Sequence, residues 1–446
     1  MKKRDQNPIK SERSVFEVFV KNVIDTSRNL VLRPNNKKLL QESSVFCMAP
    51  WTHIHVVPPG KTFPCCASGH RHDLAIGDLK KAGETLKDSW NSERMRRLRR
   101  DMLAGRKNEL CERCHKYEEL GKESERKWFN DGFKKYYSRV EKTNIDGSLD
   151  EFKPYYLDIR FSNTCNLKCR ICLHELSSAW YNDSIELGLI PKNTDRKVFP
   201  TSNQELLWPQ VRPLLNSLDR IHFAGGEPLL MEEHYMVLDE LIRLGKTKIT
   251  ITYNTNFSRL IFKNRDVLDL WKKFDEVHVF ASLDGMGEKG DYMRKGQKWE
   301  EVEKNRIRLM EECPHVKFCI NATVSLMNVL HIPEFYKDWY KRGLIGPNDI
   351  NLYLLFNPSY YSVQTLPKDI KKQVTEAYRN FEEEYLNKFE DDVSKVKTHF
   401  KSIIEFMNEK DMDELTDLRT ATRSLDKIRK ESFIETFPEL AEVILE

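Results

Sequence analysis

The sequence predicts an α/β fold: a partial (β/α)6 TIM-like barrel, preceded by a small cysteine-rich N-terminal domain and followed by a helical C-terminal extension. Three observations predict it. Strand-like and helix-like segments alternate over residues 152–365, five of the ten cysteines fall within residues 45–125, and long charged helical patterns follow Pro367. The predicted segments are a lead (1–44), the cysteine-rich domain (45–125), a connector (126–151), the barrel (152–365) and the extension (366–446).

Six segments of the barrel region have the pattern of strands. In the first of them, Leu157, Ile159 and Phe161 recur at a period of two, which places them on one face of a strand. The six segments span residues 155–163, 220–228, 248–256, 276–285, 317–326 and 350–358. Because each ends in polar, Gly or Pro residues, we expect the active site just beyond the strand ends, where parallel barrels place theirs.

Apolar residues at helical spacing lie between the strands and beyond them. Tyr235, Leu238 and Leu241 recur at intervals of three residues, which suits helices that pack on the outside of a sheet. Beyond Pro367 the helical patterns carry acidic and basic residues in a mixture. This mixture favours a solvated helical cap over a charged interaction tail.

The composition excludes some partners and locations. The net charge of +4 over 446 residues is too small to imply nucleic acid or an anionic membrane. The run of arginines over residues 94–100 lacks aromatic interleaving and is typical of a solvated helix face. No stretch approaches the ~18 apolar residues of a membrane span. We therefore expect a cytoplasmic protein, in which ten cysteines bind metal or do chemistry rather than form disulfides.

The sharpest motif is CNLKCRIC, which follows the first predicted strand and contains Cys165, Cys169 and Cys172. Three thiolates on one short loop suit a cubane iron–sulfur cluster whose fourth iron keeps an open coordination site. The alternative is a zinc site completed by His174, because zinc accepts three sulfurs and one nitrogen. Cys313 and Cys319, by contrast, are expected to be small core residues.

The motif resembles the CxxxCxxC loop of radical SAM enzymes, which also follows the first barrel strand, although Ile171 stands where that family usually has an aromatic residue. Gly225, Gly226 and Glu227, followed by Pro228, resemble the family's GGEP motif. The resemblance implies that their backbone and carboxylate hold the amino group of S-adenosylmethionine (SAM). Paired glycines permit a close approach of the main chain, and a carboxylate suits an ammonium group.

Further residues continue the resemblance at the later strand ends. Ser282 and Asp284 resemble the residues that bind the ribose of SAM, and Arg294 resembles the arginine that binds the methionine carboxylate. Asn321 is a weaker candidate for a contact with SAM, and Asn254 and Asn256 either face the same cavity or cap the end of their strand. Each residue type is common on surface loops, so it is their order along the chain that supports these assignments.

The early cysteines form a second pattern. Cys47, Cys65, Cys111 and Cys114 suit either a structural zinc or a cubane cluster, and Cys66, next to Cys65, is an alternative ligand. The order of Cys, Gly, four residues, Cys and a distant CxxC resembles the twitch or SPASM segment of radical SAM enzymes. The resemblance implies an auxiliary 4Fe-4S cluster, in the single-cluster twitch form because no further Cys occurs before Cys165. In most relatives this segment follows the barrel, whereas here it precedes it.

Together the resemblances imply two 4Fe-4S clusters and SAM as cofactors, with reductive cleavage of SAM to a 5′-deoxyadenosyl radical that takes hydrogen from a substrate. The auxiliary cluster is expected in electron transfer, and flavodoxin or ferredoxin as the electron donor. The substrate is a peptide, a protein or a small molecule that no residue identifies. The alternative is a zinc-stabilised binding protein without catalysis, which would contain zinc and no sulfide.

Overall fold

The computed structural model describes residues 38–68, 72–119, 123–202 and 204–445, so most of the predicted lead, residues 1–37, lies outside the described residues. The chain divides into two compact units. Unit 1 runs up to His55 and resumes over Lys61–Tyr155. Unit 2 comprises Val56–Gly60 and Tyr156–Glu446.

Unit 1 contains three short strands and several helices. Its strands are β1 (His53–Val57, whose last two residues belong to unit 2), β2 (Lys61–Phe63) and β3 (Gly77–Asp78). Its α-helices are α2 (Ala49–Thr52), α3 (Leu86–Trp90), α4 (Glu93–Leu103), α5 (Glu112–Glu119) and α6 (Glu125–Phe133). Helices α4 and α6 begin after Ser92 and Ser124, whose hydroxyls accept hydrogen bonds from Met95 N–H and Lys127 N–H.

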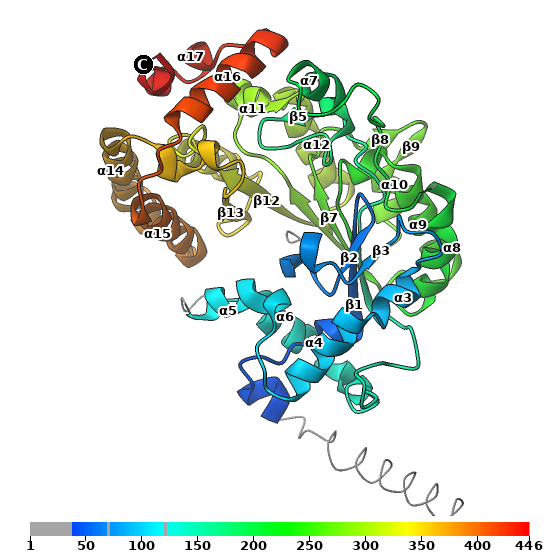
Figure 1. Ribbon diagram of the computed structural model, residues 1–446. Coiled ribbons are helices and arrows are strands. Elements are labelled where there is room, and N and C mark those ends of the chain that lie inside the picture. Colours follow the sequence, from blue (N-terminus) through cyan, green and yellow to red (C-terminus); the bar gives the residue numbers. More distant parts are fainter. Residues whose placement is uncertain (1–37, 69–71, 120–122, 203, 446) are drawn as a thin grey trace, which may run out of the picture. The chain divides into compact units, whose positions relative to one another are not determined.

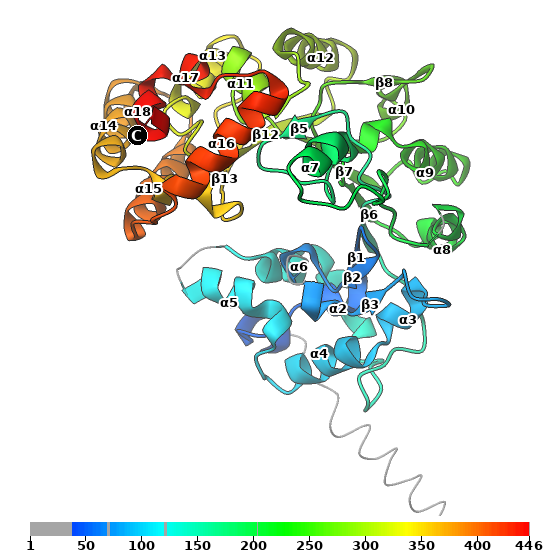
Figure 2. The ribbon, with the colours of Figure 1, turned by 45° about the horizontal axis from the view of Figure 1, so that its top comes forward.

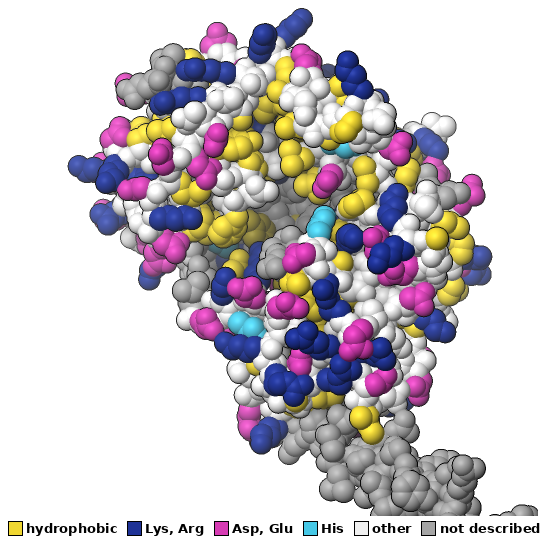
Figure 3. All heavy atoms as spheres, viewed as in Figure 1, with side chains coloured by type: hydrophobic (Ala, Val, Ile, Leu, Met, Phe, Trp, Pro, Cys, Tyr) yellow, Lys and Arg dark blue, Asp and Glu magenta, His cyan; other side chains and the backbone are white. Residues whose placement is uncertain are grey.

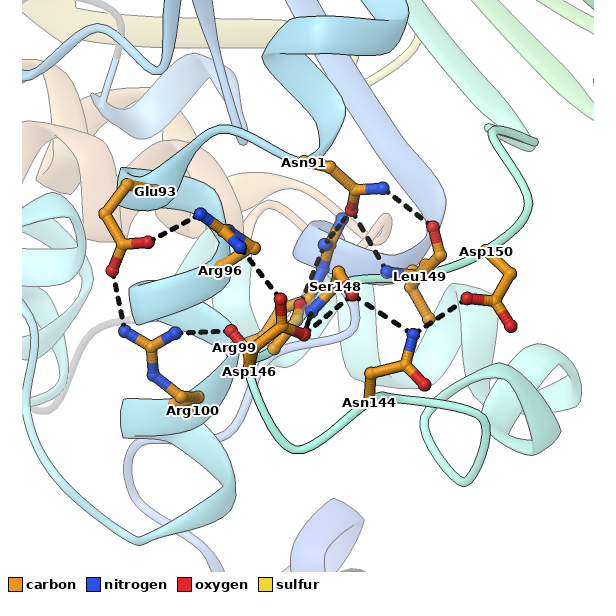
Figure 4. A network of polar contacts seen from close by, with 11 residues as sticks. Asn91, Glu93, Arg96, Arg99, Arg100, Asn144, Asp146, Ser148, Leu149 and Asp150 are labelled. Carbon is orange, nitrogen blue, oxygen red and sulfur yellow. Dashed lines mark hydrogen bonds and ion pairs between the residues drawn. The ribbon is translucent and has the colours of Figure 1, made fainter.

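The arginine run lies on α4, and the expectation of a solvated helix face is wrong for Arg99. Arg99 is fully buried and donates hydrogen bonds to the Pro50, Trp90 and Gly147 carbonyls at 2.9–3.1 Å. Burial lowers its pKa to about 9. Figure 4 shows Arg96 and Arg100 beside it, both bound to Glu93 and to Asp146. This face of α4 therefore fastens the loop around Asp146 to the helix.

All six predicted barrel strands are present in unit 2. They are β4 (Tyr156–Ile159), β6 (Arg220–Phe223), β7 (Thr250–Thr255), β10 (Glu276–Ala281), β12 (Lys317–Val324) and β13 (Ile350–Leu354). They lie in the order β13-β12-β10-β7-β6-β4, and each neighbouring pair is parallel. This is the succession that repeated β/α units produce. Two small ribbons accompany them, β5 (Lys168–Cys169) with β11 (Arg294–Lys295) and β8 (Ile261–Phe262) with β9 (Arg265–Asp266).

The two faces of these strands differ in polarity. In β10, Val277, Val279 and Ala281 are buried, whereas the alternate residues are partly exposed. The parallel register places Asn254, Phe280 and Cys319 side by side, and Asn321 beside Asn351, on the partly exposed face. The apolar face is covered by helices, and the polar face borders the predicted site. We call the latter the polar sheet face.

Helices follow the strands in sequence (Figure 1). They are α7 (Tyr181–Glu186), α8 (Trp208–Val211), α9 (Glu232–Arg243), α10 (Val267–Trp271), α11 (Gly287–Met293), α12 (Trp299–Glu312) and α13 (Ile332–Lys341). Tyr253 of β7 joins two of them, since its hydroxyl lies 2.8 Å from His234 Nε2 of α9 and 3.1 Å from Trp271 Nε1 of α10.

The predicted C-terminal extension is helical. It contains α14 (Lys368–Glu384), α15 (Ser394–Glu409), α16 (Leu415–Arg429), α17 (Phe433–Thr436) and α18 (Ala441–Leu445). The expectation of a solvated cap is wrong for α16, because Arg429 is buried and Asp426 pairs with the buried Arg170 of the barrel region. Figure 2 shows α16 beside α7 and α11.

The surface agrees with the low net charge. On the face shown in Figure 3, Lys and Arg side chains are interspersed with Asp and Glu side chains. Among the residues that the structure describes, no helix combines the length and apolar character needed to cross a membrane.

Candidate functional site

The cysteine loop, residues 165–172, begins shortly after β4 and is held at several points along its main chain. Cys165 N–H donates to Ser178 Oγ at 3.2 Å, and Cys172 N–H donates to the Cys169 carbonyl at 3.0 Å. Cys169 belongs to β5 and pairs with Arg294 of β11. The loop is therefore a fixed element, and it presents three thiols at the end of the first barrel strand.

The three thiols affect each other's ionisation. Burial raises the pKa of Cys165 to about 12. The thiols of Cys169 and Cys172 hydrogen-bond to each other, which lowers the pKa of Cys169 to about 7 and raises that of Cys172 well above its usual value. One of the pair thus ionises readily, helped by Arg294, as a site that binds a cation through thiolates requires.

The glycine pair lies against the chain that leads into this loop. Gly226 N–H donates to the Ser162 carbonyl, and a Cβ on Gly226 would lie 2.2 Å from the Thr164 carbonyl oxygen. Gly225 has a φ of +125°, a conformation that L side chains rarely adopt. The glycines therefore permit a close approach between two strand-end loops, which brings the GGEP segment next to Cys165.

Glu227 is buried and carries hydrogen bonds on both carboxylate oxygens. Oε1 accepts from Thr255 Oγ1 at 2.7 Å and from Leu229 N–H at 3.0 Å, and Oε2 accepts from Asn256 N–H at 2.6 Å. Burial raises its pKa to about 7 despite these bonds. Glu227 thus ties the end of β6 to the end of β7, and a contact with the amino group of SAM stays a prediction.

Arg294 connects two predicted site residues. Its Nη2 lies 2.8 Å from Asp284 Oδ2, its Nη1 lies 3.5 Å from Cys169 Sγ, and both charged side chains are buried. Asp284 Oδ1 also accepts from Thr323 N–H at 2.8 Å. Ser282, two residues earlier, is half-buried and its N–H donates to the Thr255 carbonyl. Arg294 Nε is buried with no hydrogen-bond partner among the described residues, so it retains donor capacity beside the thiols.

The asparagines form a ladder across the polar sheet face. Asn351 Nδ2 donates to Asn321 Oδ1 at 2.8 Å, and Asn321 Nδ2 lies 3.4 Å from Asn254 Oδ1. Asn351 also donates to Cys319 Sγ at 3.2 Å. Cys319 is therefore half-buried on this face, and the expectation of a core residue is wrong for it, although Cys313 is buried as expected. The sequence analysis missed Asn351, although it pairs with Asn321 in the parallel register.

In unit 1 the four predicted cysteines line one pocket. Cys47, Cys65, Cys111 and Cys114 meet there, and Cys66 is exposed and does not line it. The other walls are mostly apolar: Ala49, Pro50, Pro64, Leu98, Met102, Leu110 and Phe129, with Glu125 and Arg126. Burial raises the pKa of all four thiols, and that of Cys65 reaches about 12. The apolar walls and the four sulfurs fit an enclosed cluster.

Arg126 is the cation of this pocket and was missed by the sequence analysis. It pairs with Glu118 at 2.5 Å, and its Nη1 donates to the Ser43 and Phe46 carbonyls. The positive charge of Arg126 favours the thiolates of Cys111 and Cys114, but burial outweighs it and the pKa of both thiols is raised. Arg126 lies twelve residues after Cys114 and belongs to no recognisable motif, so the sequence alone does not reveal this role.

The zinc alternative for the cysteine loop, with His174 as the fourth ligand, stays a prediction. His174 Nε2 lies 2.9 Å from the Asp195 carbonyl oxygen, and its Nδ1 is buried with no hydrogen-bond partner among the described residues. Among the described residues, no three His, Cys, Asp or Glu side chains surround one point as a single metal ion requires. A cubane differs, because each thiolate binds a separate iron.

Family models match two parts of the chain. Residues 47–115 match the SPASM iron-sulfur cluster-binding domain, and residues 159–331 match the radical SAM superfamily. A curated relative, a GTP 3′,8-cyclase of Mannheimia succiniciproducens, is 25% identical over 235 residues, covering 49% of this chain and 61% of that protein.

Solved structures with similarity include anSMEcpe with bound AdoMet and the Cp18Cys peptide, at 21% identity and a TM-score of 0.36 over 52% of this chain and 60% of that one. Streptococcus suis SuiB bound to S-adenosylmethionine is 19% identical, with a TM-score of 0.35 over 62% of this chain and 60% of that one. The chain thus spans about three fifths of the length of these relatives.

The two domain matches coincide with the two groups of cysteines, and the SPASM match precedes the radical SAM match, as the sequence predicted. The cofactors of such domains are iron–sulfur clusters and SAM. Residues 159–331 therefore carry a radical SAM domain, and residues 47–115, ahead of it in the chain, carry a SPASM-type iron–sulfur segment.

Proposed function

We propose that the chain cleaves SAM reductively at a 4Fe-4S cluster held by Cys165, Cys169 and Cys172, and that the resulting radical takes a hydrogen atom from a substrate. The observation that carries the proposal is the convergence of two further segments on the cysteine loop. The GGEP glycines lie against the chain before Cys165, and the Arg294–Asp284 pair lies against Cys169. When bound, the cluster supplies the single electron that breaks a carbon–sulfur bond of SAM.

The chain's own residues bind and orient the cosubstrate in this proposal. Arg294 offers a buried cation to the methionine carboxylate, and its unpartnered Nε supplies a donor. The main chain at Gly225 and Gly226, with Glu227, faces the amino group. Ser282 and Asp284 face the ribose, and Asn321 contacts another part of SAM. Burial of Arg294, Asp284 and Glu227 keeps these groups out of solvent, and a closed site limits the side reactions of a radical.

The proposal assigns an auxiliary 4Fe-4S cluster to Cys47, Cys65, Cys111 and Cys114. If all four irons have thiolate ligands, no iron is open to substrate, so electron transfer is the natural role. The single-cluster twitch form is part of this proposal. Both clusters need reduced thiols, which supports a cytoplasmic location and a flavodoxin or ferredoxin as electron donor.

The substrate is proposed to be polar, and either a peptide or a small molecule. The polar sheet face supports this because it offers the amides of Asn254, Asn321 and Asn351 and the thiol of Cys319. Relatives named above act on GTP or bind a peptide, according to their descriptions. These descriptions are compatible with both classes.

The first test is the metal content of anaerobically purified protein. We expect about eight irons and eight sulfides per chain in wild type, and about four of each when Cys165, Cys169 and Cys172 are all changed to Ala. Formation of 5′-deoxyadenosine with dithionite and SAM should disappear with Cys169→Ala alone.

Two results would contradict the proposal. One or two zinc ions per chain without sulfide would favour a zinc-stabilised binding protein. SAM cleavage that persists in Cys169→Ala would remove the cysteine loop from the chemistry.

A further inference from the structure

Arg170 is a buried charge within the cysteine loop, between Cys169 and Cys172. Its side chain has no exposed surface. Its N–H donates to the Met293 carbonyl at 2.9 Å, next to Arg294. A cation in such a place is costly unless opposite charges compensate it, so the groups that pair with Arg170 also determine where this part of the loop can lie.

The compensating charges come from the C-terminal extension. Arg170 Nη2 is bound to Asp426 of α16 and lies 3.0 Å from Glu431, just beyond that helix. The guanidinium also stacks on Tyr292, 3.7 Å from the ring centroid, and the Tyr292 hydroxyl donates to Asp426 at 2.7 Å. The two carboxylates that neutralise the loop thus lie 256 and 261 residues later in the chain.

Asp426 is itself fixed in position. Its Oδ2 accepts from Phe433 N–H at 2.8 Å, because the chain turns back after α16 through Lys430 in the left-handed conformation. Lys295 Nζ, on the ribbon that pairs with Cys169, lies 3.1 Å from Glu431. Asp426 and Glu431 therefore form a rigid acidic end to α16.

A second contact from α16 reaches the other half of the loop. Arg429 Nε lies 2.9 Å from Asp183 Oδ2, and Lys168 of the loop lies 2.6 Å from Asp183 Oδ1. Arg429 also stacks on Trp180, whose Nε1 donates to the Cys169 carbonyl at 2.9 Å. Both charged side chains between Cys165 and Cys172 are therefore connected to α16.

We propose that Asp426, Arg429 and Glu431 form a C-terminal clamp that positions the cysteine loop for its cluster. The clamp residues are positioning residues, since they reach the thiols only through Arg170, Lys168 and Trp180. The inference rests on the proposed function, in which the loop holds the cluster. It adds that the C-terminal extension sets how firmly the cluster is held and how it responds to SAM.

The test compares Asp426→Asn with Glu439→Gln in the full chain. Asp426→Asn removes one of the two counter-charges of Arg170 and keeps an oxygen for the Tyr292 hydroxyl. Glu439 lies on the same extension, and Glu439→Gln breaks its partly exposed ion pair with Lys289 of α11 at 2.6 Å, which does not include a residue of the cysteine loop. The readouts are the rate of iron release to a chelator and the change in the electron paramagnetic resonance spectrum of the reduced protein when SAM is added.

We expect Asp426→Asn to release the iron that depends on Cys165, Cys169 and Cys172 at least about tenfold faster, the scale found for residues that support metal ligands. The SAM-induced spectral change should be reduced as well. Glu439→Gln should behave as wild type, and Asp426→Glu, which keeps the charge, should restore both readouts.

Wild-type iron release and a wild-type SAM response in Asp426→Asn would overturn the clamp. If that variant does not fold, Glu431→Gln decides by the same two readouts, because it removes one of the two carboxylates and leaves Asp426 in place. A wild-type chain without iron dependent on the three cysteines would instead refute the proposed function.

Discussion

Single residues in this chain have roles that their types alone do not reveal. Arg294 was predicted as a ligand for a carboxylate of SAM, and in the structure it already pairs with Asp284 beside Cys169. An arginine offers five donors, so one guanidinium serves an internal carboxylate and still has donors left for a bound molecule. The pair therefore orients Arg294 before SAM arrives, which reduces the entropy lost on binding.

Gly226 provides a prediction at this scale. Gly226→Ala places a methyl group 2.2 Å from the Thr164 carbonyl oxygen, so the loop before Cys165 has to move. We expect a loss of about 1 to 3 kcal/mol in stability, as for other overpacked sites, and less iron bound by the cysteine loop.

The matched control for this substitution is Gly132→Ala. Gly132 lies in α6 with no atom within 4 Å of an added Cβ, so alanine should be neutral or stabilising by up to about 1 kcal/mol. Thermal unfolding and iron assays report both effects. Equal behaviour of the two variants would show that the close approach at Gly226 has no structural role.

At the scale of elements, β7, α9 and α10 are joined through the hydroxyl of Tyr253. Trp271 Nε1 can only donate, so this hydroxyl accepts from Trp271 and gives its own proton to His234 Nε2. His234 is fully buried and must then be neutral. Burial lowers its pKa to about 3.

The lowered pKa predicts acid sensitivity. Between pH 6.5 and pH 3 the unfolded chain binds a proton at His234 and the folded chain does not, so stability falls as the pH decreases through this range. At pH 5 the loss is about 2 kcal/mol. His234→Gln stays neutral, and its urea midpoint should decline less between pH 7.5 and pH 5 than that of wild type.

His315→Gln, which changes an exposed histidine, controls for the substitution itself. A parallel decline in wild type and His234→Gln would contradict the buried neutral histidine.

The sequence predicted elements well where their pattern is local. The strands around Leu157, Ile159 and Phe161 and the helix around Leu238 follow from alternation and helical spacing, which adjacent residues suffice to reveal. The interpretation of α16 failed for the converse reason. Asp426 and Arg429 have partners in distant parts of the chain, and charges on a helix have the same pattern whether they face water or a buried arginine. The pocket cation Arg126 and the ladder residue Asn351 were missed for the same reason.

At the scale of the whole molecule, the two groups of cysteines lie in different compact units. Each unit folds its own thiols into place, so we expect loss of one cluster to leave the other bound. Cys65→Ala should remove about four irons and retain 5′-deoxyadenosine formation, because the cysteine loop is unchanged.

Cys66→Ala is the matched control, since this neighbouring thiol is exposed and outside the pocket. It should keep the full iron content. If Cys66→Ala loses iron and Cys65→Ala does not, then Cys66 is the cluster ligand and Cys65 is not. If Cys65→Ala loses all iron, the units do not hold their clusters independently.

The distance along the chain between Arg170 and Asp426 also has a consequence for biosynthesis. The ribosome must add 256 residues after Arg170 before Asp426 exists, which at ~5–20 residues per second takes roughly 13 to 50 s. During that interval the nascent cysteine loop carries a cation whose counter-charge has not yet been made. If iron and sulfide arrive after α16 has folded, they bind to a cysteine loop that Asp426 already holds in position. If they arrive earlier, they bind to three thiols on a loop that α16 does not yet contact.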